Sequence, residues 1–158
     1  MSLNVAINKI LVPVDGSEPS ERAAKYAVYL AKKLKAHIIA VHVMHVPAYF
    51  LTTMPIEGMP TPAPIPVQVT VSGEEKKVVE GYLNKVKEIA KNADVALEAK
   101  ILENQQPIVR VITEFAENEG CSLIVMGTKG RTGMKRFLLG SVASGVVTYA
   151  HCPVLVVR

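Results

Sequence analysis

Residues 127–141 read GTKGRTGMKRFLLGS and combine features that bind anions. Three glycines recur at every third position, four basic residues lie between and after them, and a Gly-Ser pair ends the stretch. Glycine lets backbone N–H groups approach an anion without a Cβ in the way, and lysine or arginine strengthens the positive field. The stretch has neither the Gly-Lys-Ser/Thr ending of a P-loop nor the G-x-G-x-x-G spacing of a dinucleotide fold. Its interpretation therefore depends on the elements that flank it.

The excess positive charge of the chain lies in this stretch. The sequence has 18 basic and 14 acidic residues, and the excess equals the four basic residues of the stretch, Lys129, Arg131, Lys135 and Arg136. A solvated basic loop and an anion site both account for four such charges. Binding of nucleic acid is disfavoured, because no basic stripe occurs elsewhere and few aromatic residues are present to stack bases.

The composition is that of an ordinary globular protein. The chain has 158 residues, 49% hydrophobic and 20% charged, which suits a single domain with a sizeable core. No apolar run approaches the roughly 18 residues of a membrane span, and the N-terminus lacks the pattern of a signal peptide. We therefore expect a cytoplasmic protein without membrane contact.

Cysteine and histidine residues give no metal or disulfide pattern. Cys121 and Cys152 are far apart in sequence, and each precedes an apolar run, which favours burial as small hydrophobic side chains. A redox pair is the alternative if the two runs are neighbouring strands. His42 and His45 are three residues apart, a spacing that points them to opposite faces of a strand.

Residues 127–141 lie within a sequence that alternates between predicted strands and predicted helices. Short apolar runs predict strands at 9–14, 37–43, 96–102, 122–126 and 153–157. Helical periodicity predicts helices after Ser17, over 73–93, from Pro107 to Gly120 and over 140–149, with Ser17 as the cap of the first and Pro107 at the start of the third. This order predicts an α/β fold with one doubly wound, five-stranded parallel sheet and helices on both faces.

Two loops of the predicted fold carry residues suited to contact a ligand: PVDGS after the first strand and GTKGRTG after the fourth. Such sheets bind ligands beyond the carboxyl ends of their strands, where the strand order reverses. If both loops line one crevice, the first and fourth strands are neighbours. This favours the strand order 3-2-1-4-5 over 2-1-3-4-5.

The glycine stretch then becomes a strand-to-helix loop. Gly127 follows a buried strand, and Gly140 and Ser141 precede a helix whose N-terminus offers unpaired N–H groups. A chain of phosphate groups fits these donors and the nearby cations. Taken singly, each glycine is also explained as a turn residue, and Ser141 as a helix cap.

The spacing Gly127, two residues, Gly130, nine residues, Gly140, Ser141 forms the pattern G-x2-G-x9-G-[S/T]. With it, the chain resembles the ATP-binding branch of the universal stress protein family. The segments NKILVPVDGSEPSERAAKYAVYLAKKL, AVHV, LIVMGTKGRTGMKRFLLGSVASGVV and HCPVLVVR are similar to that family as well. The resemblance covers nearly the whole chain except about residues 46–72. It implies one universal stress protein domain over 1–158, with an adenine nucleotide alpha hydrolase-like fold.

The resemblance also implies a role for each matching residue, with ATP as the ligand. The ribose hydroxyls would be held by Asp15, and the backbone of Val43, after His42, would meet the adenine edge. The remaining residues of the adenine and ribose pocket would be Pro13, Val14, Met126 and Gly127. The phosphates would be held by Gly130, Gly140, Ser141 and the amide of Val142, with Mg²⁺ or Mn²⁺ between the phosphates and no metal ligand from a protein side chain. From their charge we add Arg131 and Lys135 as candidate phosphate contacts, with surface exposure as the alternative.

Residues 46–72 fit no regular pattern. They contain six of the ten prolines and one charge, Glu57, and proline excludes a helix or a central strand. We expect a long loop, the variable part of the domain, and its apolar content suggests a lid over the adenine or a docking site for a protein partner. A loop packed against its own domain is the other interpretation.

The last apolar run, 153–157, is an expected edge strand, and an apolar edge invites pairing with a second chain. Universal stress proteins commonly dimerise by antiparallel pairing of that strand, so the resemblance implies a homodimer.

Two classes of function fit these observations. One is a nucleotide-dependent regulator in the stress response. The other is an ATP-using enzyme on the same fold, with weak ATPase activity or adenylyl or phosphoryl transfer. The motifs H-x-G-H and S-G-G-x-D-S are absent, and no base for an attacking water is evident near the glycines, so no residue is assigned as catalytic. The regulator is favoured, and a binder of AMP or a cyclic nucleotide is a third option.

Overall fold

The computed structural model describes residues 6–46, 48–67, 69–128 and 139–158. Five parallel strands form the central sheet: β1 (Lys9–Pro13), β2 (His37–His45), β5 (Leu97–Asn104), β6 (Leu123–Gly127) and β7 (Val154–Val157). Their order across the sheet is β5-β2-β1-β6-β7. When these five strands are counted by themselves, this is the predicted order 3-2-1-4-5, and the expected neighbours β1 and β6 are paired.

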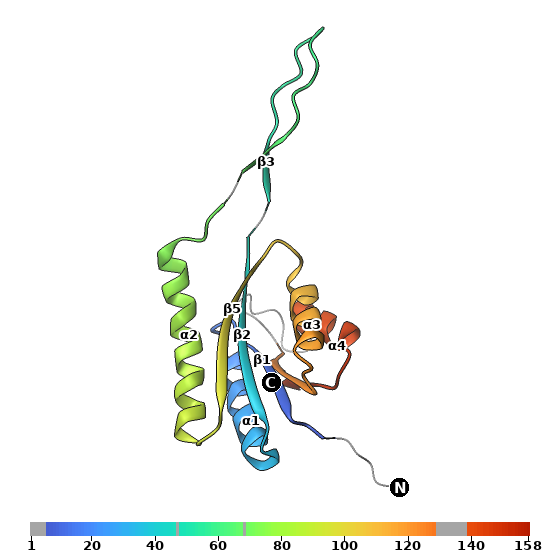
Figure 1. The fold of residues 1–158 in the computed structure, drawn as a ribbon. Helices are drawn as coiled ribbons and strands as arrows, with labels where there is room; N and C mark the ends of the chain where they lie inside the picture. The colour runs from blue at the N-terminus through green and yellow to red at the C-terminus, as the bar shows by residue number, and fades with distance from the viewer. Residues whose placement is uncertain (1–5, 47, 68, 129–138) are drawn as a thin grey trace.

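Helices cover both faces of the sheet, as predicted (Figure 1). On one face lie α1 (Glu18–Leu34) and α2 (Gly73–Asn92), whose buried residues join one apolar cluster with alternate residues of the strands. On the other face lie α3 (Ile108–Asn118) and α4 (Ser141–Tyr149), which build a second cluster. The strands are therefore buried on both sides, which explains why they read as continuous apolar runs.

Local sequence explains where the helices begin. Ser17 caps α1 by accepting a hydrogen bond from the Ser20 amide, and Pro19 lies in the first turn, where it costs no hydrogen bond. At α2, Ser72 and Glu75 form a reciprocal capping box.

Residues 46–72 differ from the loop predicted for them. They contain two short antiparallel strands, β3 (Tyr49–Leu51) and β4 (Ile65–Val67), which form a hairpin. Proline does not prevent this pairing, because Pro66 lies in a two-stranded ribbon that needs hydrogen bonds on one side only. We call residues 48–67 the arm.

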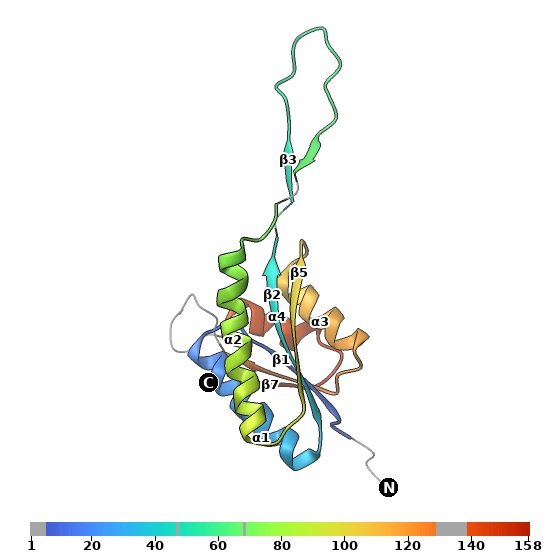
Figure 2. The same cartoon turned by 60° about the vertical axis from the view of Figure 1, so that its left-hand side comes forward.

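The arm extends away from the sheet and the helices (Figures 1 and 2). Its residues are exposed throughout, and Met54 at 91% and Met59 at 67% of their full surface show that even large apolar side chains lack cover. Neither a lid over the cavity described below nor a loop packed on its own domain matches this arrangement.

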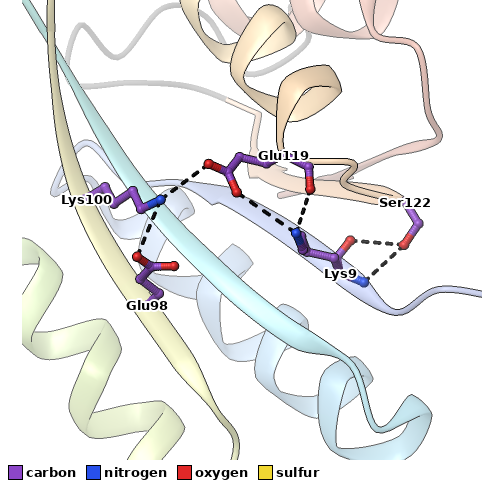
Figure 3. A network of polar contacts seen from close by, with 5 residues as sticks. All are labelled: Lys9, Glu98, Lys100, Glu119 and Ser122. Atoms are coloured by element: carbon purple, nitrogen blue, oxygen red, sulfur yellow. Dashed lines mark hydrogen bonds and ion pairs between the residues drawn. The ribbon is translucent and has the colours of Figure 1, made fainter.

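At the amino ends of the strands, a polar network joins α3 to the sheet (Figure 3). Lys9 Nζ donates to the carbonyl oxygen of Glu119 at 2.6 Å, and the Lys9 amide donates to Ser122 Oγ at 3.2 Å. Lys100 Nζ lies 3.4 Å from carboxylate oxygens of Glu98 and Glu119. Desolvation lowers the pKa of Lys100, but hydrogen bonds and charges from the Glu119 and Glu98 carboxylates outweigh it and raise that pKa. The network stabilises the sheet at the amino ends of its strands, opposite the carboxyl ends where the candidate site lies.

Candidate functional site

A cavity of about 290 Å³ opens at the carboxyl ends of β1, β2 and β6 and at the start of α4. This is where the strand order reverses, because the chain proceeds from β1 to β2 in one direction and from β5 across to β6 in the other. The cavity is lined by nine of the eleven predicted site residues: Pro13, Val14, Asp15, Val43, Met126, Gly127, Gly140, Ser141 and Val142. The other two, Gly130 and Arg131, lie outside the described residues, as does Lys135.

Asp15 stands at the end of β1 in a turn that fixes its carboxylate. Asp15 Oδ1 accepts hydrogen bonds from the Ser17 amide at 3.0 Å and from the Ser17 hydroxyl. The Asp15 amide lies 3.5 Å from the oxygen of the buried Ser20 side chain. Both hydrogen bonds from Ser17 use Oδ1 and neither uses Oδ2. The turn therefore uses one carboxylate oxygen and leaves the other to accept from a ligand.

Two hydrogen bonds connect β2 to the backbone of Val14, the residue before Asp15. The Val14 amide donates to the carbonyl oxygen of Val41 at 2.8 Å. His42 Nδ1 lies 2.6 Å from the carbonyl oxygen of Val14. Because a carbonyl oxygen only accepts, the proton of this bond resides on Nδ1, so the imidazole acts here as a donor.

Val43 presents backbone groups to the cavity. β1 pairs with β2 only as far as Pro13 and Val41, whereas β2 continues to His45. Since backbone groups alternate sides along a strand, the amide and carbonyl of Val43 face the same side as the Val41 carbonyl, where β1 has ended. A planar heterocycle with donor and acceptor atoms on its edge fits such a strand edge.

The N-terminus of α4 forms the third wall. Gly140 is its N-cap, and no side chain caps the first turn, which also carries no acidic residue. The Gly140 amide donates to the Thr128 carbonyl at 2.8 Å, which links the start of α4 to the residue that follows β6. The first-turn amides lie beside the exposed Ser141, and unpaired N–H groups at a helix N-terminus are a favourable environment for an anion.

Some lining residues were not predicted from the sequence. They are Ser20, Val41, Ile108, Ile112, Thr128 and Ala143, and His42 was named only as a neighbour of Val43. Ile108 and Ile112 have the helical spacing of core residues, and that spacing does not distinguish a cavity wall from a core. Thr128 follows directly on Gly127, so its place after a strand was the available signal.

The two cysteines are reduced and lie in the apolar cluster of α3 and α4. Burial, foremost, raises the pKa of the Cys121 thiol to about 11, and burial also raises the pKa of Cys152. Thiols with raised pKa values are poor nucleophiles, in agreement with their interpretation as small core residues. Among the described residues, no group of three His, Cys, Asp or Glu side chains is placed to bind a metal ion. Within the same residues, no helix has the length and apolarity needed to cross a membrane.

Comparison with known proteins identifies the family. The family model described as "Universal stress protein family" matches residues 6–158. A universal stress protein of Methanocaldococcus jannaschii is 40% identical over 150 residues, which are 95% of this chain and 81% of the relative.

Solved structures share the fold. A universal stress protein from Archaeoglobus fulgidus superposes with a TM-score of 0.71 at 21% identity, covering 97% of this chain and 95% of that one. A structure described as a universal stress protein in complex with cAMP superposes with a TM-score of 0.68 at 21% identity, covering 97% of this chain and 98% of that one. At such identities the likeness concerns the fold.

Proposed function

This chain belongs to the universal stress protein family, and from that premise we propose that it binds ATP and acts as a nucleotide-dependent regulator in the stress response. The observation that carries the proposal is the convergence of three groups on one cavity. They are the Asp15 carboxylate, the backbone edge of Val43 and the N-terminus of α4.

Each group matches one part of an adenine nucleotide. Asp15 Oδ2 would accept from the vicinal ribose hydroxyls, much as an acidic residue does in dinucleotide sites. The Val43 backbone would meet the adenine edge, with Met126 and Ile108 among the apolar walls. Ser141 and the amide of Val142 would hold phosphates at the start of α4. Gly130, Arg131 and Lys135 are proposed to extend this phosphate site.

Mg²⁺ or Mn²⁺ would be bound through the phosphates. Among the described residues that line the cavity, Asp15 is the one carboxylate, and its Oδ1 atom accepts from Ser17. This donor set does not form a metal site without the nucleotide, but it leaves room for an ion whose ligands are phosphate oxygens and water. The ion would neutralise phosphate charge beside α4.

A regulator is favoured over an enzyme by the groups that line the cavity. Hydrolysis or transfer needs a base that orients the attacking group. Asp15 is fixed in its turn at the ribose end, and His42 Nδ1 donates its proton to the Val14 carbonyl. Neither is positioned as a base at the phosphate end, so turnover slower than about 1 per second is expected.

A binder of AMP or a cyclic nucleotide is the second candidate. The universal stress protein structure described as a complex with cAMP supports it, because its fold matches this one. The basic residues of the glycine loop favour a ligand with more phosphates.

Thermal melting with ATP, ADP, AMP, cyclic AMP and GTP, each with magnesium, tests the proposal. ATP at 100 times its Kd should add about 2.7 kcal/mol, a rise in Tm of roughly 5–11 °C for a chain of this size. Asp15→Asn keeps an oxygen for the Ser17 turn but removes the charge, and it should reduce the rise, as should Gly140→Val. Glu88→Ala removes an exposed carboxylate on α2 and serves as the matched control. No shift with any nucleotide, on protein shown to be free of nucleotide, would exclude an adenylate site.

Partners and location follow as further proposals. We propose a cytoplasmic homodimer that pairs through the edge strand β7, in which Leu155 is 37% exposed. Removing residues 154–158 should give a monomer by light scattering, and a persistent dimer would place the interface elsewhere. The arm is proposed as a contact for a protein partner because its apolar side chains are uncovered.

A further inference from the structure

The loop that carries Asp15 has a second support, on the face of α2. Tyr82 lies half-buried at the middle of that helix, and its ring faces Gly16, the residue after Asp15. A Cβ at Gly16 would collide with the Cε1, Cζ and Cδ1 atoms of that ring. Gly16 also has φ of +80°, a conformation that other residues rarely adopt. The loop is thus shaped to bring its backbone directly against an aromatic ring.

Tyr82 also contacts the histidine that holds the loop. The rings of His42 and Tyr82 have their centroids 6.2 Å apart at an interplanar angle of 51°. This is a tilted aromatic pair within the range that contributes attraction. His42 in turn donates to the Val14 carbonyl, so one tyrosine packs on the loop directly at Gly16 and indirectly through His42.

The space behind the loop is small. Between Val14, Gly16, Tyr82 and Lys85 there remains a gap of only about 10 Å³. A gap of that size holds at most one water, so the loop has little room to retreat toward α2. Removing the ring would open this space beside Gly16 and release the backbone next to Asp15.

We infer that Tyr82 is a positioning residue: its ring holds the Val14–Ser17 turn so that the Asp15 carboxylate meets the ribose hydroxyls of the nucleotide. The nucleotide as ligand rests on the proposed function, whereas the positioning of the turn by Tyr82 does not depend on it. The positioning role predicts that an α2 residue outside the cavity sets how strongly the site selects for a ribose with free hydroxyls.

The ligand test compares ATP with 2′,3′-dideoxy-ATP by calorimetry. Hydrogen bonds to the Asp15 charge should make wild type favour ATP by about 10- to 100-fold. Tyr82→Ala should reduce this ratio at least about threefold, whereas Tyr82→Phe keeps the ring carbons that face Gly16 and should reduce it less than Tyr82→Ala does. Leu83→Ala removes a buried side chain of α2 that does not line the loop, and it should lower Tm without changing the ratio.

A ligand-free test uses hydrogen exchange at the Ser17 amide, which donates to Asp15 Oδ1. Tyr82→Ala should accelerate that exchange about tenfold or more, Tyr82→Phe should accelerate it less than Tyr82→Ala does, and Leu83→Ala should leave it close to wild type.

The outcomes separate the inference from the proposed function. An unchanged nucleotide ratio and unchanged exchange in Tyr82→Ala would overturn the positioning role, as would equal losses in Leu83→Ala. If wild type binds no adenine nucleotide, the proposed function is wrong, and the exchange rates alone then decide whether Tyr82 positions the turn.

Discussion

Gly127 is a position at which one added methyl group should be costly. It ends β6, where the strand passes over the first turn of α1. A Cβ at Gly127 would lie 2.7 Å from the Pro19 carbonyl carbon and 2.9 Å from the Ser20 amide nitrogen. These are backbone atoms of a helix, so no change of rotamer relieves the contact, and Gly127→Ala must displace the start of α1 from the sheet. The Ser20 amide also donates to the capping oxygen of Ser17 at 3.3 Å, so the displacement strains the cap.

Overpacking of this kind costs about 1–3 kcal/mol. For a chain of this length that corresponds to a fall in Tm of roughly 2–12 °C. Urea unfolding followed by circular dichroism measures the change in free energy, and the m-value should stay constant. Gly73→Ala is the control, because no atom lies within 4 Å of the added Cβ at the exposed start of α2. It should change stability by less than about 0.5 kcal/mol. A Gly127→Ala protein as stable as the Gly73→Ala protein would refute the close approach of β6 and α1.

Three further perturbations test other parts of the fold. Gly81→Ala, in open space on α2, should stabilise the protein by about 0.5–1 kcal/mol. Gly145→Ala would place a Cβ 2.7 Å from Val109 Cγ2, and in urea unfolding this variant should be less stable than Gly81→Ala by about 1–3 kcal/mol. Equal effects of the two substitutions would contradict the packing of α4 on α3. Burial raises the pKa of Cys121 from 9.0 to about 11, so the unfolded state binds fewer protons between those values and stability should fall with rising pH over that window, by at most about 3 kcal/mol. Urea unfolding from pH 8 to 11 should show a shallower decline in Cys121→Ala, and parallel curves would count against this burial effect. Replacing residues 51–65 with Asn-Gly shortens the arm to a tight turn, and because these residues are exposed the free energy of unfolding should change by less than about 1 kcal/mol; a larger loss would mean that the arm supports the core.

The sheet and its order were predictable because two physical patterns agreed. Continuous apolar runs such as residues 9–14 occur where both faces of a strand are buried, and the runs alternated with helical stripes. The strand order followed from a functional argument: PVDGS and the glycine-rich stretch at 127–141 line one crevice at the carboxyl ends of the strands only if β1 and β6 are neighbours. The structure pairs these strands.

The arm was harder to predict, because its proline content argued against any pairing. Proline removes a donor from a ladder, but a two-stranded hairpin can place Pro66 where that donor is not required. The direction of the arm depends on how β2 extends beyond its neighbour β1. No local pattern in residues 46–72 records that extension.

The contact of Tyr82 with Gly16 is a kind of contact that the hydrophobic periodicity of a helix does not predict. Tyr82 lies within the helix predicted over 73–93, and the sequence gives no sign that its ring meets a loop instead of a strand. Gly16 in turn reads as a turn residue after Asp15. Only the packing of α2 beside α1 brings the two together, and this contact joins residues that are 66 positions apart in the chain.

These contacts argue that the Asp15 side of the cavity is formed before any ligand arrives. The turn is bounded by Tyr82 on one side and by His42 and the Val41 carbonyl on another, and the close approach of Gly127 fixes the start of α1 just beyond it. A ligand group that meets Asp15 would therefore lose little free energy to ordering of this turn. If binding changes the conformation of the protein, the change should be concentrated at the α4 side, where Gly140 and the helix N-terminus would receive the phosphates. ATP and adenosine would then differ in the conformational signal that they produce more than in their contacts with Asp15.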